Sequence, residues 1–280
     1  MKKTIVSIML ILVVGVIVGS FFISLRRPSN DRNWAIEDSI MPYTTFDGDL
    51  VTIHNIRNFK YGKDHLDITP DYYDKTFDLS NIESAWLGVN PFKSWRGIAH
   101  TFVSFGFTDD EYISVSVETR MEEGEEYSPL TGLANAYEII YQIGDENDII
   151  KVRTNYRENE AVHLYPIKTT PERMRHVFVA MLERTNELRQ KPEFYNTLTH
   201  NCTSTLIQHV NDLLPSRVPK WHVGTIFPGY SDHLAYNLDM IDSDLEWKKI
   251  RDYYYVNDRA RALGNEVVGK EFSKRIREFD

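Results

Sequence analysis

A long apolar run lies near the start of the chain. Residues 4–25 (TIVSIMLILVVGVIVGSFFISL) carry no charge and are numerous enough to cross a bilayer as a helix. The run exceeds the ~7–15 residues of a typical cleavable signal core, and no A-x-A site follows it. We therefore predict that residues 1–28 are an uncleaved transmembrane signal-anchor, with removal as a signal peptide as the alternative.

Polar and alternating patterns follow this run. Residues 29–45 are polar with little periodicity, which is typical of a linker. After the turn signal Asp47-Gly48, residues 50–56 (LVTIHNI) alternate between apolar and polar positions and predict a strand. Residues 58–79 are rich in Lys, Asp and Tyr without a clear period, so we expect a surface loop there.

Several later segments alternate as strands do. Residues 98–107 (IAHTFVSFGF) and 112–119 (YISVSVET) flank a short polar connection, which predicts a hairpin. Residues 136–143 (AYEIIYQI) and 149–154 (IIKVRT) flank Gly-Asp-Glu-Asn-Asp and indicate a second hairpin. Residues 162–167 (VHLYPI) predict an edge strand. The pattern as a whole predicts a sheet of roughly five or six antiparallel strands.

The period then changes to that of a helix. Thr170 and Pro171 are a helix-start signal, and the apolar stripe over residues 174–188 predicts a helix of about 18 residues. A second stripe over residues 206–214 predicts another helix, which stops at Pro215 because proline breaks the hydrogen-bond ladder.

These elements predict an α+β domain, an antiparallel sheet with packed helices, over residues 46–245. A charged C-terminal helical tail is expected at residues 246–280. Four of the 32 basic side chains lie in residues 1–28, whereas all 41 acidic ones follow that segment, so the remainder has a net charge of −13. This charge excludes nucleic acid as a partner. Anionic lipid headgroups are also repelled, so lipid chemistry would depend on the anchor and an apolar groove.

The single cysteine, Cys202, lies in residues 199–210 (THNCTSTLIQHV), at or near the first turn of the second predicted helix. Free backbone N–H groups and the helix dipole favour a thiolate there, and the same groups can stabilise an oxyanion. A small buried apolar residue is the alternative, although the neighbours His200 and Asn201 are polar. His200, Cys202 and His209 fit no familiar metal-ligand spacing, so we predict no metal site and no cofactor.

A thiol nucleophile needs an imidazole that takes and returns its proton. Among nine histidines, His100 lies in an apolar strand that would hold its ring rigidly, with a structural role as the alternative. On the next predicted strand, Ser114, Ser116 and Glu118 share one face by alternation. Glu118 is the candidate that orients His100, unless it pairs with Arg120. Ser116 and a backbone carbonyl are the other candidates for this third position.

The chain order of these candidates is a histidine on a strand, a polar residue on the next strand and a cysteine at a helix start. This order resembles the circularly permuted branch of the papain-like NlpC superfamily. More narrowly, five segments between about residues 30 and 230 resemble the family of the N-terminal extracytoplasmic domain of Lnb-type lipoprotein N-acyltransferases. The segments are 51–62 (VTIHNIRNFKYG), 97–107 (GIAHTFVSFGF), 113–128 (ISVSVETRMEEGEEYS), 150–157 (IKVRTNYR) and 193–204 (EFYNTLTHNCTS). The resemblance implies a circularly permuted papain-like fold.

The resemblance also carries site residues over to this chain. Cys202 and His100 match the family's cysteine and histidine, and Glu118 matches the glutamate of its ETR motif. The positions that would bind substrate are Arg57, Asn58, Tyr61, Arg120 and Asn201. The first three would shape the entrance of the cleft or form a loop held by its own side chains. Asn201 would donate to the oxyanion or cap the helix.

The activity that the resemblance implies is acyl transfer within a bacterial lipoprotein. An acyl chain would move from the diacylglyceryl group on the terminal cysteine to the α-amine of that cysteine, through an acyl-Cys202 intermediate. The substrate is then a membrane lipid or lipoprotein. The chain would be a single-pass protein of the cytoplasmic membrane, with its main domain in the periplasm or extracellular space. A cell-wall peptidase or amidase is the second interpretation, and an exported binding module without activity is the third.

Overall fold

The computed structural model describes residues 25–92, 95–157, 159–214 and 217–279, together with residues 15, 19 and 23. The predicted anchor, residues 1–28, lies outside the described residues except for residues 15, 19, 23 and 25–28. Within the described part, no helix is both long enough and apolar enough to cross a membrane.

The centre of the molecule is an eight-stranded sheet in the order β1-β2-β9-β8-β7-β6-β10, with β5 also paired to β2. Its strands are β1 (Tyr43–Asp47), β2 (Leu50–Arg57), β5 (Tyr72–Asp78), β6 (Ile82–Pro91), β7 (Ala99–Phe107), β8 (Glu111–Arg120), β9 (Glu138–Gly144) and β10 (His163–Pro166). Neighbouring strands pair antiparallel, apart from a short parallel contact between β2 and β9. A separate two-stranded ribbon consists of β3 (Lys60–Tyr61) and β4 (Ile68–Thr69). The α+β class with a largely antiparallel sheet is confirmed.

The hairpin predicted for residues 98–119 is present as β7 and β8. Phe102 lies opposite Ser116, so alternation along β8 puts Ser114, Ser116 and Glu118 on one face of the strand. Asp109 and Asp110 in the connection have positive φ angles of 64° and 56°, a conformation that aspartate tolerates in tight turns. The predicted strand at residues 162–167 is also confirmed, because β10 pairs with β6.

The second predicted hairpin is wrong. Residues after β9 do not return as a strand but form helix α2 (Glu146–Ile149) and a π-helical turn, η4 (Val152–Tyr156). Asp145 begins α2 by accepting a hydrogen bond from the backbone N–H of Asn147. Ile149 and Ile150 are both fully buried in one cluster, whereas consecutive strand residues would face opposite sides.

The predicted loop at residues 58–79 is also wrong, because it contains β5. This strand pairs with β2, and Phe77 and Leu79 enter the main core. The other positions of β5 are occupied by tyrosine and polar residues, so the strand shows no clear alternation of apolar and polar positions in the sequence. The sequence pattern also missed β6, which lies between β7 and β10. Gly88 interrupts the apolar pattern of β6 because a Cβ there would overlap the ring of Phe102.

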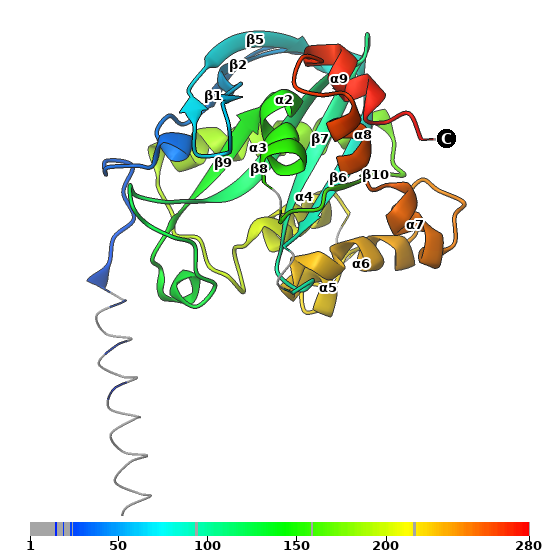
Figure 1. Cartoon of the computed structure of the whole chain (residues 1–280). Helices are drawn as coiled ribbons and strands as arrows, with labels where there is room; N and C mark the ends of the chain where they lie inside the picture. The colour runs from blue at the N-terminus through cyan, green and yellow to red at the C-terminus, as the bar shows by residue number, and fades with distance from the viewer. Residues whose placement is uncertain are drawn as a thin grey trace, which may run out of the picture.

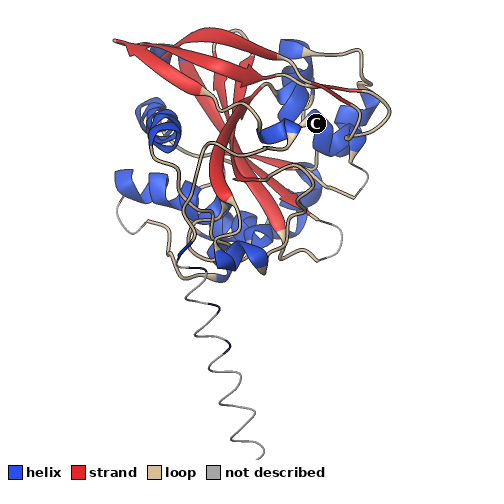
Figure 2. Cartoon of the chain, turned by 90° about the vertical axis from the view of Figure 1, so that its left-hand side faces the viewer, coloured by secondary structure: helices blue, strands red, loops and turns tan. Residues whose placement is uncertain are grey.

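Helices cover both faces of the sheet (Figures 1 and 2). Helices α3 (Pro171–Gln190) and α4 (Cys202–Leu213) contribute to the main core on one face, and Thr170 caps α3 as predicted. On the other face, Phe102 packs with Phe272 and Ile276 in a second cluster. The remaining helices are α5 (Val223–Ile226), α6 (Ser231–Asn237), α7 (Trp247–Tyr253), α8 (Asn257–Ala262) and α9 (Gly269–Arg275). Short 3-10 turns are η1 (Ile36–Asp38), η2 (Leu79–Asn81), η3 (Thr131–Ala134) and η5 (Pro228–Tyr230).

Candidate functional site

Cys202 is the first residue of α4, as the sequence predicted. Asn201 and Ser204 form a capping box, in which Asn201 Oδ1 accepts from Ser204 N at 2.8 Å and Ser204 Oγ accepts from Asn201 N at 2.9 Å. The amide nitrogen of Asn201 donates to Thr197 O at 2.8 Å, so both polar atoms of this side chain hold the helix start. The thiol is therefore fixed at the positive end of the helix dipole.

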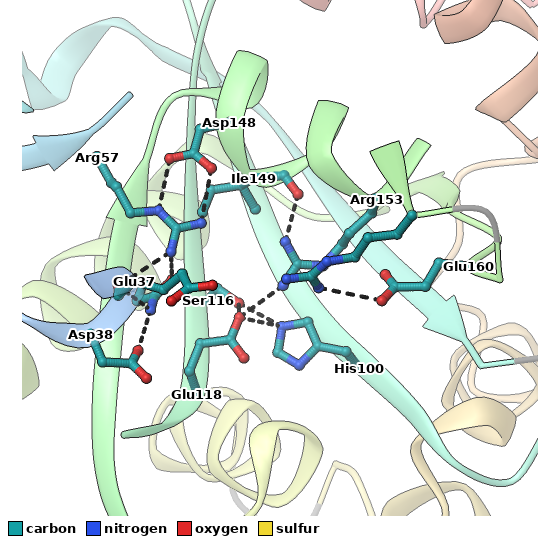
Figure 3. Close-up of polar contacts among 12 residues, drawn as sticks. Glu37, Asp38, Arg57, His100, Ser116, Glu118, Asp148, Ile149, Arg153 and Glu160 are labelled. Atoms are coloured by element: carbon teal, nitrogen blue, oxygen red, sulfur yellow. Dashed lines mark hydrogen bonds and ion pairs between the residues drawn. The ribbon is translucent and has the colours of Figure 1, made fainter. Parts of the chain in front are cut away.

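His100 faces the polar side of β8. Its Nε2 lies 2.6 Å from Ser116 Oγ and 3.0 Å from Glu118 Oε1, and Ser116 Oγ itself donates to Glu118 Oε1 at 2.7 Å (Figure 3). Because Nε2 is held by these two side chains, Nδ1 is the ring nitrogen left for the thiol. The strand register thus brings together His100, Ser116 and Glu118, which lie 16 and 2 residues apart along the chain.

Glu118 has a further partner that the sequence pattern did not single out. Arg153 Nη2 donates to Glu118 Oε1 at 2.9 Å, and its Nη1 donates to Ile149 O at 2.6 Å (Figure 3). Arg153 lies on η4, the segment that we expected to be a strand. Arg153 lies in residues 150–157, one of the segments that carry the family resemblance, but its contact with Glu118 depends on the turn after β9 and could not be read from that segment.

Arg120 does not pair with Glu118. Its Nε donates to Asp38 O at 3.0 Å and its Nη1 donates to Asn30 Oδ1 at 3.0 Å. The guanidinium also lies 4.1 Å from the ring centre of Trp34, a cation–π contact. Arg120 therefore fastens the segment before β1 to the domain.

The charges of the site shift the pKa values of its members. Burial alone would lower the pKa of His100, but Glu118 and the hydrogen-bonded Cys202 outweigh it and raise this pKa to about 9. Burial would raise the pKa of the Cys202 thiol, but hydrogen bonding and charge from His100, with bonds from Thr101, hold it below its usual range. Burial likewise acts against the ionised Glu118, yet His100 and Arg153 keep its pKa well below the ordinary value. The site therefore favours a thiolate, an imidazolium and a carboxylate together.

Cys202, His100 and Glu118 line one pocket of about 200 Å³. Its other walls include Asp38, Arg57, Tyr61, Asn90, Phe92, Ile98, Tyr127, Gln142, Arg153, Arg157 and Tyr195. Both polar and apolar side chains thus surround the thiol, as in most small-molecule sites.

Arg57 and Tyr61 reach this pocket through a buried network. Arg57 donates to Asp148 from Nε at 2.7 Å and from Nη2 at 2.9 Å (Figure 3). Tyr61 OH donates to the same carboxylate at 2.6 Å. Asn58 instead donates its backbone N–H to Asp71 O at 2.9 Å. Arg57 and Tyr61 are therefore held by Asp148 of α2, outside their own segment, and both side chains form part of the pocket wall.

Asp38 is a pocket residue that the sequence pattern missed. It belongs to η1, within the predicted linker, and its carboxylate accepts from Met121 N at 3.0 Å and Gln142 Nε2 at 2.6 Å. Burial raises the pKa of Asp38 to about 7, opposed by the Met121 hydrogen bond.

The other two histidines near Cys202 in sequence do not join the site. His209 Nε2 lies 2.7 Å from Tyr141 OH, and burial lowers the pKa of His209 to about 4. His200 is exposed and contacts Thr199. In the described ranges, no group of three or more His, Cys, Asp or Glu side chains is placed to hold a metal ion.

Comparison with known proteins gives one match. A family model described as the Lnb N-terminal periplasmic domain matches residues 69–227. This range includes Cys202, His100 and Glu118 but begins after Arg57 and Tyr61. No curated protein and no solved structure matches the chain.

Proposed function

The chain belongs to the family of the Lnb N-terminal periplasmic domain, and from this premise we propose that it is an extracytoplasmic, cysteine-dependent acyltransferase or hydrolase of lipid esters. The single observation that carries the proposal is the thiol at the start of α4 beside an imidazole whose far nitrogen contacts a carboxylate. The order of a strand histidine followed by a helix-start cysteine also supports a circularly permuted papain-like arrangement.

In the first step of the proposed reaction, the Cys202 thiolate attacks the carbonyl carbon of an acyl ester. The backbone N–H groups at the start of α4 stabilise the oxyanion. As the bond between the carbonyl carbon and the alcohol oxygen breaks, the His100 imidazolium gives its proton to that oxygen. The products are a free hydroxyl on the lipid and an acyl thioester on Cys202.

In the second step, an amine attacks the thioester and His100, now neutral, takes a proton from the attacking nitrogen. The carbon–sulfur bond breaks, the thiolate returns and an amide is released. If the amine is the terminal cysteine of the same lipoprotein, the product is a lyso-lipoprotein. If water attacks instead, the product is a fatty acid and the protein is a hydrolase. Glu118 positions His100 in both steps and stabilises its charged form.

The rate of iodoacetamide alkylation against pH tests the proposal directly, because the chain contains one cysteine. In the wild type we expect the thiolate to titrate below the usual pH range of a cysteine. In His100→Ala we expect the titration to move to higher pH, because burial of the thiol remains while the charge that opposes it is gone.

His209→Ala is the matched control for this measurement. His209 is a buried histidine of α4, the helix that begins at Cys202, but its ring contacts Tyr141 rather than the thiol. Its alkylation profile should follow that of the wild type. A wild-type thiol with an ordinary profile that is indifferent to His100→Ala would contradict the nucleophile assignment and favour a binding module.

Glu118→Gln should alter both turnover and the pH dependence of stability. Because Glu118 is the main group that raises the pKa of His100, its loss lowers that pKa and moves the alkaline limit of turnover to lower pH. General acid–base catalysis contributes about 10²- to 10⁴-fold to a rate, and loss of the group that positions His100 should remove part of this contribution. A raised pKa means that the stabilisation from charged His100 is complete below pH 6.5 and is lost as the pH rises through about 9.

Urea unfolding at pH 6.5 and at pH 9 measures this stabilisation, and turnover measured over the same range gives the alkaline limit. Glu118→Gln should show a smaller difference in unfolding free energy between the two pH values than the wild type. Glu183→Gln, a change of the same chemistry at an exposed position of α3, should leave both profiles unchanged. Identical profiles for Glu118→Gln and the wild type would exclude the positioning role.

A further inference from the structure

Large apolar side chains are exposed in four connecting segments of the chain. The most exposed are Leu130, at 78%, and Trp221, at 76%. The others in these segments are Trp95, Leu133, Leu198, Val223 and Phe227. The segments are the connection between β6 and β7, the loop containing η3, the loop before α4, and α5 with the residues around it. We call these seven residues the apolar end of the molecule.

Contacts join the segments in pairs. Thr197, in the loop before α4, donates its N–H to Gly132 O at 3.4 Å and its hydroxyl to Pro129 O at 2.9 Å. The ring centres of Trp95 and Phe227 lie 5.2 Å apart. In Figure 1, the green loop that contains η3 and the gold helix α5 both lie at the lower end of the molecule. The apolar end is therefore one side of the fold rather than scattered single residues.

The continuously described part of the chain, from residue 25 onward, begins at this same end. Arg26 Nη1 donates to Asn135 O at 3.2 Å, on the loop that also carries Leu130 and Leu133. Ser29 N donates to Glu138 Oε1 at 3.0 Å, which fixes the next residues of the chain to the domain. The uncharged run of residues 4–25 thus ends beside the apolar end.

The Cys202 pocket reaches towards the apolar end. Tyr127, which is 38% exposed, precedes the η3 loop and lines the pocket. Its ring centre lies 6.5 Å from that of Tyr195, another pocket residue. Ile98 and Phe92 line the pocket from the connection that also carries Trp95. The apolar wall of the pocket and the apolar end therefore share segments of the chain.

We propose that residues 4–25 enter a bilayer and that the apolar end lies in the interface of that bilayer, so that a lipid reaches Cys202 from the membrane. A tryptophan side chain is suited to this depth, because its ring enters the lipid while its N–H remains in the interface. The leucine side chains add purely apolar surface, whose burial in lipid is favourable. The docking goes beyond the proposed function, since it requires no acyl transfer.

Charge indicates which lipid surface the apolar end meets. The chain after residue 28 has 41 acidic and 28 basic side chains, and the acidic run Glu122, Glu123, Glu125 and Glu126 lies near the first described residues, where Arg32 contacts Glu122. Anionic headgroups would therefore not attract this surface. Burial of apolar groups in a zwitterionic interface remains as the driving force, and it should be insensitive to salt.

Site-specific fluorescence in phosphatidylcholine nanodiscs tests the docking. The full chain with Cys202→Ser contains no thiol, so Leu130→Cys, Trp221→Cys or Val268→Cys then provides one site for a bimane label. Val268 is the control, because it is 57% exposed but precedes α9, at the upper end of Figure 1. Nitroxide groups on the lipid acyl chains quench only nearby labels.

We expect strong quenching at positions 130 and 221 and little at position 268, with no change at high salt. Equal weak quenching at all three positions would overturn the proposal, and would leave the surface as a docking site for protein. Because every labelled variant lacks the Cys202 thiol, this outcome is independent of whether the proposed acyl transfer takes place.

Discussion

Cys202→Ser is expected to abolish turnover of a detergent-dispersed lipid ester while the protein stays folded. The thiol is the group that the site ionises: burial would raise its pKa, but hydrogen bonding and charge from His100, with bonds from Thr101, hold that pKa below the usual value. A serine hydroxyl does not ionise in this range, and loss of a nucleophile costs on the order of 10⁴-fold or more in kcat. The change in the free energy of unfolding should stay within about 1–2 kcal/mol, because the replacement is nearly isosteric.

Turnover and a melting curve, measured on the same preparation, check this result. His209→Gln is the matched control, since it changes a buried histidine of α4 whose ring contacts Tyr141. It should retain turnover, whereas His100→Gln should lose it. Wild-type activity on muropeptides in place of lipid esters would favour the peptidase interpretation. Lipid turnover that survives in Cys202→Ser would exclude the thiol mechanism.

Arg57→Met is expected to have the largest effect on stability. Asp148 is fully buried and accepts two hydrogen bonds from Arg57, one from Phe59 N at 2.9 Å and one from Tyr61. Methionine fills a similar volume but leaves this carboxylate without its cation. Removal of one partner of a buried ion pair typically costs about 3–5 kcal/mol of unfolding free energy.

Urea unfolding of matched variants tests the pair. The double variant Arg57→Met/Asp148→Asn should recover part of the loss, because it removes the uncompensated charge as well. Lys168→Met is the control, since Lys168 pairs with Asp239 at 3.0 Å with both side chains largely exposed. That variant should change stability little, as exposed ion pairs usually do. If Arg57→Met behaves like Lys168→Met, the network around Asp148 does not stabilise the fold.

The three candidates for chemistry were predictable because each depends on local spacing. The alternation of residues 98–119 predicts a hairpin. The register of that hairpin pairs Phe102 with Ser116, so Glu118 lies towards the end of β7 that carries His100. The Asn201 capping box and the stripe that follows it predict a helix that starts at Cys202. These signals span only a few residues, so they can be recognised in a single sequence without any knowledge of how the side chains pack. The catalytic roles of these residues remain proposals.

Local pattern failed where burial overrides alternation. Residues 149–154 alternate in part as a strand would, but both Ile149 and Ile150 belong to one fully buried cluster, which a turn of helix accommodates and a strand does not. In β6, the ring of Phe102 packs where a side chain at position 88 would lie, so a glycine stands there. This glycine interrupts the apolar pattern by which the sequence would have predicted the strand. In each case the environment that decides the structure is formed by residues far away in the chain.

The sequence by itself determined the class of fold, the hairpin with His100 and Glu118, and the thiol at a helix start, because backbone periodicity and helix capping are local. Only the tertiary structure decided which charges surround that thiol. Arg153 meets Glu118 across 35 residues, Gln142 meets Asp38 across 104, and Arg57 meets Asp148 across 91. Such pairs produce no periodic pattern in the sequence. Whether a charged side chain can be buried depends on a partner that is close in space and on the loss of water around both groups.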